Sequence, residues 1–178
     1  LKRLPDMNVT QIFCDADDFC QRFIPDWEQR QLEPDEKTKT RARARSVCES
    51  EIITLVVCYH LSGYRTFKWF YQRLVQKYWL ADFPGLPSYN RFVELMSDVL
   101  MPIAAFMQNR CGMGKGIAFI DSTSLCVCKN IRIPRHKTFK DVAGRGKSST
   151  GWFYGFKLHL MVDDCGEILS FSITRGNV

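Results

Sequence analysis

The positions of the hydrophobic residues near the start of the chain predict a helix. Between residues 10 and 24 hydrophobic side chains recur every three or four residues, the spacing that places them on one face of a helix. The predicted face consists of Ile12, Ala16, Phe19, Cys20 and Phe23. Because proline has no backbone N–H, Pro25 is expected to end this helix.

Two further helices are predicted between residues 46 and 79. The sequence SVCE at 46–49 has the pattern of a capping box, so a largely buried helix is expected to begin there and to end near Leu61. The clearest amphipathic pattern in the chain predicts a helix from Thr66 to Trp79. Its expected core-facing stripe is Phe67, Phe70, Tyr71, Leu74, Val75 and Tyr78. This stripe is more typical of a protein core than of a base-stacking surface.

A last helix is expected after the FPGLP loop at 83–87, with Ser88 as its cap and with Pro102 kinking or splitting it. The two helices joined through residues 61–65 have the connection length and the glycine of a helix-turn-helix. Any short pair of antiparallel helices has the same features. The pattern therefore leaves DNA reading and simple packing as equal alternatives.

The pattern changes near residue 111, where helical periodicity ends and strand-like runs begin. Three strands are expected, at about 117–128, 152–162 and 168–174, with a hairpin turn at the DDCG sequence 163–166. A long basic loop is expected between the first two strands. These elements predict an α+β chain with a helical region over 1–110 and a second domain over 111–178.

The basic residues are concentrated in two stretches of the chain. Residues 37–46 contain five Lys or Arg and no acidic residue, and residues 129–147 contain seven Lys or Arg and a single acid, Asp141. Such stretches favour a polyanionic partner such as nucleic acid, with a solvated loop as the plain alternative.

The cysteine spacing and the hydropathy of the chain indicate its cellular location and whether a zinc site or a membrane span is expected. No two of the eight cysteines have C-x-x-C spacing, and the first residues show no apolar signal segment, so a zinc site is not expected and a reducing cytoplasm is the expected location. The longest apolar run, residues 52–61, is about half the length that a membrane span needs, so no membrane association is expected.

Asp121 is the residue most suggestive of chemistry. It lies within the apolar sequence IAFIDSTSL at 117–125, which predicts burial of the strand on at least one face. A buried carboxylate needs a partner, and a divalent cation bound by hard oxygen ligands is one. The alternative is that Asp121 caps the turn formed by residues 122–124. Composition alone gives the two readings equal weight.

Several segments taken together resemble the DDE-type transposases of bacterial insertion sequences. The segments are FIDSTSLCVC (119–128), HKTFKD (136–141), GKSSTGWFYGFKLHLMVDDCGEILSF (146–171) and ITRGNV (173–178). The earlier SEIITLVVCYHLSGYRTFKWFY (50–71) and FPGLPSYNRFVELM (83–96) are similar to the helical region that precedes the catalytic domain in the same family.

The resemblance implies an RNase H-like fold that opens with three antiparallel strands, with the first catalytic and metal-binding aspartate at Asp121. It assigns residues 1–110 to a helical DNA-binding or accessory region and residues 111–178 to the start of the RNase H-like catalytic domain. It also implies that Mg²⁺ or Mn²⁺ is the cofactor and that the partner is DNA at the element ends, with a homo-oligomer as an open alternative. In the family the second aspartate follows a sequence like Gly-Asn-Val, and a glutamate follows much later. The sequence ends at Val178, so the domain is expected to be incomplete and the chain to be inactive in strand transfer.

The predicted DNA-contacting residues lie in the two basic stretches: Arg41, Arg43, Arg45, Arg135, His136, Lys137, Lys140, Arg145 and Lys147. Lys157 and His159 alternate on one side of the second strand, where an outward structural face is favoured over phosphate binding. Asp163 and Asp164 are explained by hairpin chemistry, near the start of the first strand, and not by catalysis.

Two other functions stay open at this stage. One is a DNA-binding module or repressor derived from a transposase, which would bind DNA without a metal. The other is an RNase H-like nuclease, which would prefer RNA hybrids or branched DNA. The family is enzymatic, but whether this chain is itself an enzyme is left open.

Overall fold

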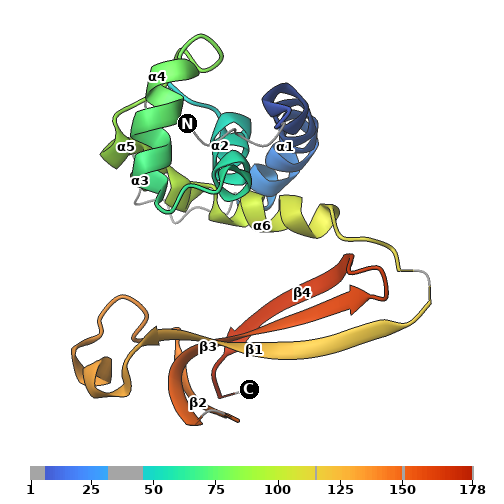
Figure 1. The fold of residues 1–178 in the computed structure, drawn as a ribbon, viewed down its shortest axis with the longest axis vertical. Helices are drawn as coiled ribbons and strands as arrows, with labels where there is room; N and C mark the ends of the chain where they lie inside the picture. Colours follow the sequence, from blue (N-terminus) through green and yellow to red (C-terminus); the bar gives the residue numbers. More distant parts are fainter. Residues whose placement is uncertain (1–6, 32–45, 115, 150, 178) are drawn as a thin grey trace. The chain divides into compact units, whose positions relative to one another are not determined.

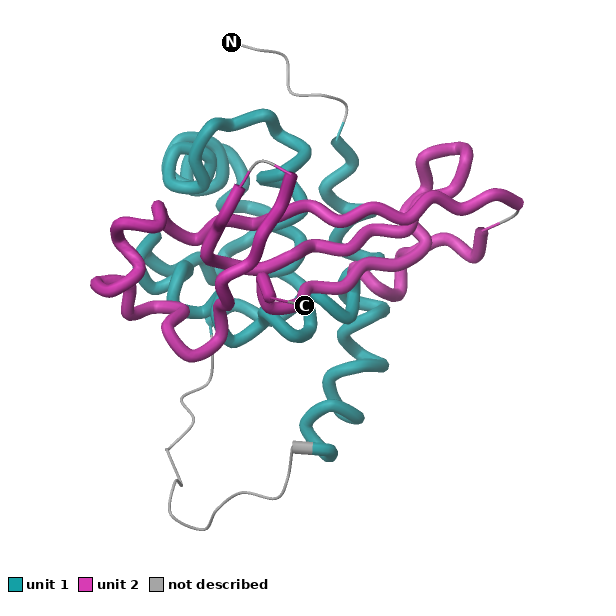
Figure 2. The backbone as a smooth tube through the Cα atoms, turned by 90° about the horizontal axis from the view of Figure 1, so that it is seen from below, with its two compact units in different colours: residues 1–106 teal, residues 107–178 magenta. Residues whose placement is uncertain are grey.

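The computed structural model describes residues 7–31, 46–114, 116–149 and 151–177. The chain divides into two compact units, residues 1–106 and residues 107–178 (Figure 2). Helices form the first unit, and a four-stranded antiparallel sheet forms most of the second (Figure 1). The predicted α+β class is confirmed. No described helix is long and apolar enough to cross a membrane.

Helix α1 runs from Val9 to Gln31 and contains Pro25. The prediction that Pro25 ends the helix is wrong. A proline removes one hydrogen bond from a helix, and here the stacked rings of Phe19, Phe23 and Trp27 continue across that turn, with centroids 5.0 and 5.8 Å apart. Packing on both sides of Pro25 therefore outweighs the lost bond.

Helix α2 runs from Glu49 to Ser62, close to the predicted bounds. The capping box lies two residues later than predicted: Cys48 is the N-cap, and its backbone N–H donates to Oε2 of Glu51 at 2.8 Å. Gly63 ends the helix in the left-handed conformation, with φ of 69°.

The next helical segment is continuous but not uniform. It consists of α3 (Phe67–Phe70), a π-helical turn (Tyr71–Val75) and α4 (Gln76–Tyr78). Thr66 caps it, because its Oγ1 accepts the backbone N–H of Trp69 at 3.4 Å. The predicted extent is confirmed, whereas the π turn was not predicted.

The π turn changes which aromatic residue reaches the core. Tyr78, expected in the buried stripe, is 65% exposed, and that part of the prediction is wrong. A π turn adds one residue to a turn and shifts the following side chains around the helix by about one position. Trp79 packs in the core instead, with its ring centroid 5.8 Å from that of Phe70.

The last two helices are α5 (Tyr89–Asp98) and α6 (Leu100–Asn109). Oγ of Ser88 accepts the backbone N–H of Arg91 at 3.4 Å, as expected of a cap. The helix splits at Val99, and Pro102 lies in the first turn of α6, where a missing N–H costs little. The predicted splitting is confirmed.

Two clusters of buried side chains hold the helical unit together. The larger one joins α2, the segment 67–79 and α5 around Phe92, which is fully buried and lies 4.8 Å from Tyr71 between ring centroids. The smaller one joins α1 to α2 and α6 through Phe19, Ile53 and Phe106.

The sheet of the second unit is organised around its longest strand. Strand β3 (Gly151–Asp163) pairs with β1 (Ala118–Cys128) along one edge. Its other edge pairs first with β2 (Gly144–Ser148) and then with β4 (Ile168–Arg175), all antiparallel (Figure 1). The three predicted strands are present. The predicted basic loop differs from expectation, because it contains a 3-10 helix (Asn130–Arg135) and the additional strand β2.

The larger cluster of buried side chains, around Phe92, leads to a prediction about stability. Replacing Phe92 by alanine is expected to lower the free energy of unfolding by about 3–5 kcal/mol, because the cavity left among Tyr71 and its neighbours cannot collapse fully. The neighbouring, exposed Val93 is the matched control, and Val93→Ala should cost under about 1 kcal/mol. Urea unfolding of both variants measures the difference; equal losses would contradict the assignment of Phe92 to the core.

The buried cysteines give a second prediction. Burial raises the pKa of the Cys58 thiol from 9.0 to about 11. Since the thiolate is the nucleophile, iodoacetamide at pH 8 should alkylate Cys58 about 100-fold or more slowly than an exposed cysteine such as Cys165. Peptide mass spectrometry over time measures both rates. In denaturant the difference should vanish; equal rates in the folded protein would show that α2 is not packed as described.

Candidate functional site

Asp121 lies in the middle of β1, where the sheet register defines its surroundings. It pairs with Leu160 on β3, which in turn pairs with Phe171 on β4. Directly paired residues of antiparallel strands project to the same face of a sheet. Asp121 is therefore a carboxylate on a face that is otherwise mainly apolar. The neighbouring positions of this face are Phe119, Thr123, Leu125, Phe156, Leu158, Val162 and Ile173.

Asp121 is exposed, so the prediction that it is buried is wrong. The reason is that the described residues of the second unit form a single sheet layer, and other side chains of the same face, such as Phe119 and Ile173, are also 57% and 59% exposed. One carboxylate oxygen, Oδ1, accepts the backbone N–H of Ser122 at 2.7 Å. No arginine of the described residues makes an ion pair with Asp121.

The basic segment between β1 and β2 is anchored on the same face of the sheet as Asp121. The hydroxyl of Tyr154 donates to the carbonyl oxygens of Phe139 at 3.3 Å and Lys140 at 3.2 Å. The ring of Phe139 packs edge-on against Phe156, with centroids 5.6 Å apart. Tyr154 and Phe156 are an even number of positions from Leu160 on β3, so all three side chains project to the same face of the sheet.

A third contact fixes the end of this segment. Arg175 pairs with Phe156 in the sheet register, and its guanidinium donates to the carbonyl oxygen of Asp141 at 2.5 Å. From Phe156 to Leu160, the partner of Asp121, is about 13 Å along the strand at 3.3 Å per residue. The structure thus brings the basic segment and the carboxylate to one face.

The predicted cations of this region all have exposed side chains: Arg135, Lys137, Lys140, Arg145 and Lys147. Arg145 and Lys147 pair with Tyr154 and Trp152 in the hairpin of β2 and β3, and Nζ of Lys147 lies 6.0 Å from the centroid of the Trp152 ring. Trp152 is exposed and lies two residues before Tyr154 on β3, so it projects to the same face of the sheet. The sequence predicted Trp152 at the start of a strand but not its place beside Lys147, because the strand β2 was not predicted.

His136 differs from the other predicted DNA-contacting residues. Its ring is half-buried and stacks on Phe139 with centroids 5.8 Å apart, and Nε2 accepts the backbone N–H of Phe139 at 3.3 Å. Within the described residues it thus has a structural role in the basic segment. Arg41, Arg43 and Arg45 lie outside the described residues.

Lys157 and His159 lie on the opposite face of the sheet from Asp121. They pair with Ser124 and Ser122 of β1, whose positions alternate with that of Asp121. A nitrogen of His159, Nε2, is 2.9 Å from Oγ1 of Thr174, a contact within this second face. The register therefore separates both residues from the carboxylate.

The acidic turn after β3 is explained by hairpin hydrogen bonds. Oδ1 of Asp163 accepts the backbone N–H groups of Cys165 at 3.0 Å and Glu167 at 2.7 Å. Asp163 pairs with Ala118 at the start of β1, as the sequence predicted, and projects to the face opposite Asp121. Among the described residues, Asp163, Asp164 and Cys165 form a cluster of possible metal ligands, but the amides of the turn already use an Asp163 oxygen.

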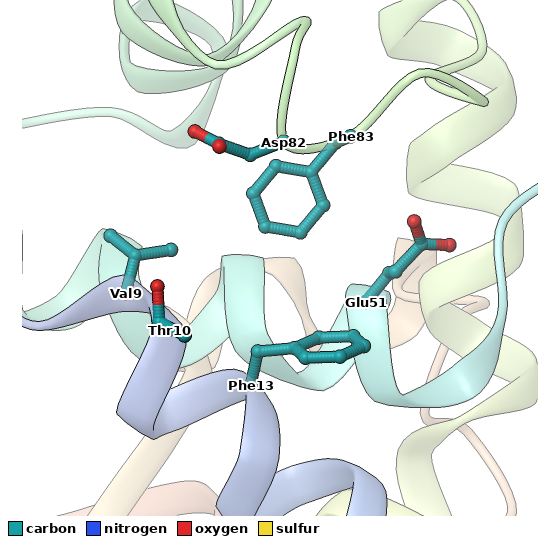
Figure 3. Close-up of a pocket in the computed structure, with 6 residues that line it drawn as sticks. All are labelled: Val9, Thr10, Phe13, Glu51, Asp82 and Phe83. Atoms are coloured by element: carbon teal, nitrogen blue, oxygen red, sulfur yellow. The ribbon is translucent and has the colours of Figure 1, made fainter.

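A pocket of about 250 Å³ lies in the helical unit, between α1, α2 and the loop before α5 (Figure 3). Its lining residues are Val9, Thr10, Phe13, Glu51, Asp82 and Phe83. The carboxylate of Glu51 already bonds to the backbone of Cys48, and the remaining lining is mainly apolar. Nothing in this lining resembles a set of catalytic groups.

Comparison with known proteins gives one match. Residues 111–178 match the family model described as "Transposase DDE domain". No curated protein and no solved structure gives a significant match. The matched segment contains the whole sheet, the anchored basic segment and Asp121. Residues 111–178 of this chain are therefore similar to the transposase DDE domain family.

Proposed function

We propose that the chain functions as part of a bacterial insertion-sequence transposase, which binds DNA at the element ends and cleaves and transfers strands with a divalent metal. The observation that carries this proposal is the shared sheet face of Asp121 and the basic segment anchored by Tyr154. A phosphodiester backbone held by the cations would lie beside the carboxylate. The match of residues 111–178 to the family model described as "Transposase DDE domain" supports the same function.

Asp121 fits the role of one metal ligand. Its carboxylate is exposed, and Ser122 occupies one side of Oδ1, which leaves further lone pairs for a hard cation such as Mg²⁺ or Mn²⁺. When bound, such an ion would stabilise the charge that develops on a phosphodiester during strand cleavage. The nearest residues of the same face, Leu160 and Phe171, are apolar and carry no side-chain group that would compete with Asp121 for the cation.

The cations of the second unit are proposed to bind the DNA backbone. The carbonyl oxygen of Lys140 accepts from the Tyr154 hydroxyl, and the backbone N–H of Lys140 donates to the carbonyl oxygen of Lys137 at 3.4 Å. The backbone of both lysines is thus held while their side chains are exposed. Phosphate contacts of this kind position a duplex without reading its sequence. Arg145 and Lys147 would extend the contact along the hairpin. Arg41, Arg43 and Arg45 are proposed to add to it.

Binding of a metal by Asp121 can be tested without DNA. During titration with Mn²⁺, the amide NMR signals of Asp121, Ser122 and Leu160 are expected to broaden first, because paramagnetic broadening falls steeply with distance from the ion. Asp121→Asn should abolish this broadening. The control is Asp164→Asn, which removes an exposed carboxylate from the turn and should leave the signals around Asp121 unchanged.

The same proposal predicts that the chain by itself does not catalyse strand transfer. Asp121 is the single acidic residue that β1, β3 and β4 place on the apolar face, and one carboxylate cannot neutralise or position two divalent ions. The 178-residue chain should therefore give no detectable Mg²⁺-dependent strand transfer on labelled duplex DNA. Cleavage that requires Mg²⁺ and disappears in Asp121→Asn would contradict this prediction.

A further inference from the structure

The helical unit presents a continuous polar strip on the outer side of residues 65–78. The buried side of this segment consists of Phe70, Tyr71, Leu74 and Val75. The outer side consists of seven residues whose side chains are all exposed: Arg65, Lys68, Trp69, Gln72, Arg73, Lys77 and Tyr78. Arg65 immediately precedes the N-cap Thr66, and the spacing of three or four residues aligns the other six along one side of the helix. We call these seven residues the outer strip.

The outer strip is strongly cationic. It holds four Lys or Arg residues, and residues 52–81 contain no Asp or Glu. None of the four cations forms an ion pair with a carboxylate in the described part of the chain. By contrast, Arg91 on the neighbouring α5 is 2.8 Å from Oε2 of Glu94. A run of unpaired cations concentrates positive potential and attracts an anionic partner.

Two exposed aromatic side chains lie among these cations. Trp69 is 61% exposed, and the guanidinium carbon of Arg73 lies 5.2 Å from the centroid of its ring. A guanidinium held over an aromatic ring can still donate its N–H groups to phosphate oxygens. Tyr78 is turned outward because of the π turn. Large exposed aromatic groups beside cations are typical of binding surfaces.

The dimensions and chemistry of the outer strip fit duplex DNA. The helical segment Phe67–Tyr78 is about 18 Å long at 1.5 Å per residue, and the major groove admits a single helix. The cations are spread along that length, as the charges of a phosphate backbone are. An acidic protein could bind in the same way only if its carboxylates lay at the same spacing as these cations. Gln72 adds an amide that can donate to and accept from a base edge.

We infer that the outer strip is a DNA-binding surface that contacts duplex DNA without a metal, through Arg65, Lys68, Arg73 and Lys77 and through the Trp69 ring. The inference rests on the proposed function for its partner, DNA. It adds a second contact surface in the helical unit, carried by residues outside the matched segment 111–178.

Fluorescence anisotropy of a labelled duplex, in EDTA and over a series of salt concentrations, tests this inference with the full chain. The double variant Lys68→Gln/Arg73→Gln is compared with Arg22→Gln/Arg91→Gln, which removes two exposed cations elsewhere in the helical unit. The outer-strip variant should bind about tenfold or more weakly at 0.1 M salt, with a slope of log affinity against log salt lower by about 2. The control pair should leave both unchanged.

A third variant separates stacking from charge. Trp69→Ala should weaken binding severalfold without changing the salt slope, since it removes a ring and no charge. Circular dichroism verifies that each variant keeps its helices.

The outcomes distinguish this inference from the proposed function. Equal losses in the outer-strip and control variants would overturn the inference, while the Mn²⁺ experiment on Asp121 would still stand. Binding of polyglutamate as tightly as duplex DNA would overturn the assignment of DNA as partner. If the wild-type chain bound no DNA at all, the inference would fail together with the DNA-binding part of the proposed function, but not the metal-binding part.

Discussion

The antiparallel pairing of β1 with β3 is the constraint on which the candidate site depends. Because paired residues share a face, this single register places Asp121 beside Leu160 and assigns Lys157 and His159 to the other side. The same strand β3 carries Tyr154, whose hydroxyl holds the basic segment. A slip of one residue in the register would move Asp121 to the face of His159 and separate it from every anchored cation.

Packing in the helical unit decides which aromatic residues face the solvent. The buried rings of Phe70, Tyr71 and Phe92 hold the segment 67–79 against α2 and α5. The π turn then brings Trp79 inward and Tyr78 outward. The exposed chemistry of the outer strip is thus a consequence of how the core is filled, because the side that packs leaves the cations and Trp69 on the other side.

Much of this architecture could be predicted from the sequence, for identifiable reasons. The apolar spacing located the helices, Ser88 and Thr66 marked their starts, and the DDCG turn located the hairpin between β3 and β4. Prediction failed where a competing contact outweighs the single sequence signal that was used. Pro25 lies within a helix because ring stacking continues past it, and Cys48 takes the N-cap position that the sequence pattern gave to Ser46.

The site shows the same division. Position 121 could be singled out from the sequence because a carboxylate among apolar residues is unusual, and the three long strands were predicted from strand-like runs and the DDCG turn. Its burial was predicted wrongly, because burial depends on what covers the sheet and not on the strand itself. The contacts of Tyr154 and Arg175 with the basic segment join residues 14–34 positions apart, and no local pattern reports them.

One uninterrupted strand carries both the anchor, Tyr154, and the partner of Asp121, Leu160. The spacing of the cations from the carboxylate is therefore set by backbone geometry alone, without a hinge. An insertion or deletion in β3 can change that spacing and keep both side chains on one face only if it involves an even number of residues. An indel of two residues between these positions would change the reach by about 7 Å and keep the face, whereas an indel of one would turn the anchor to the wrong side.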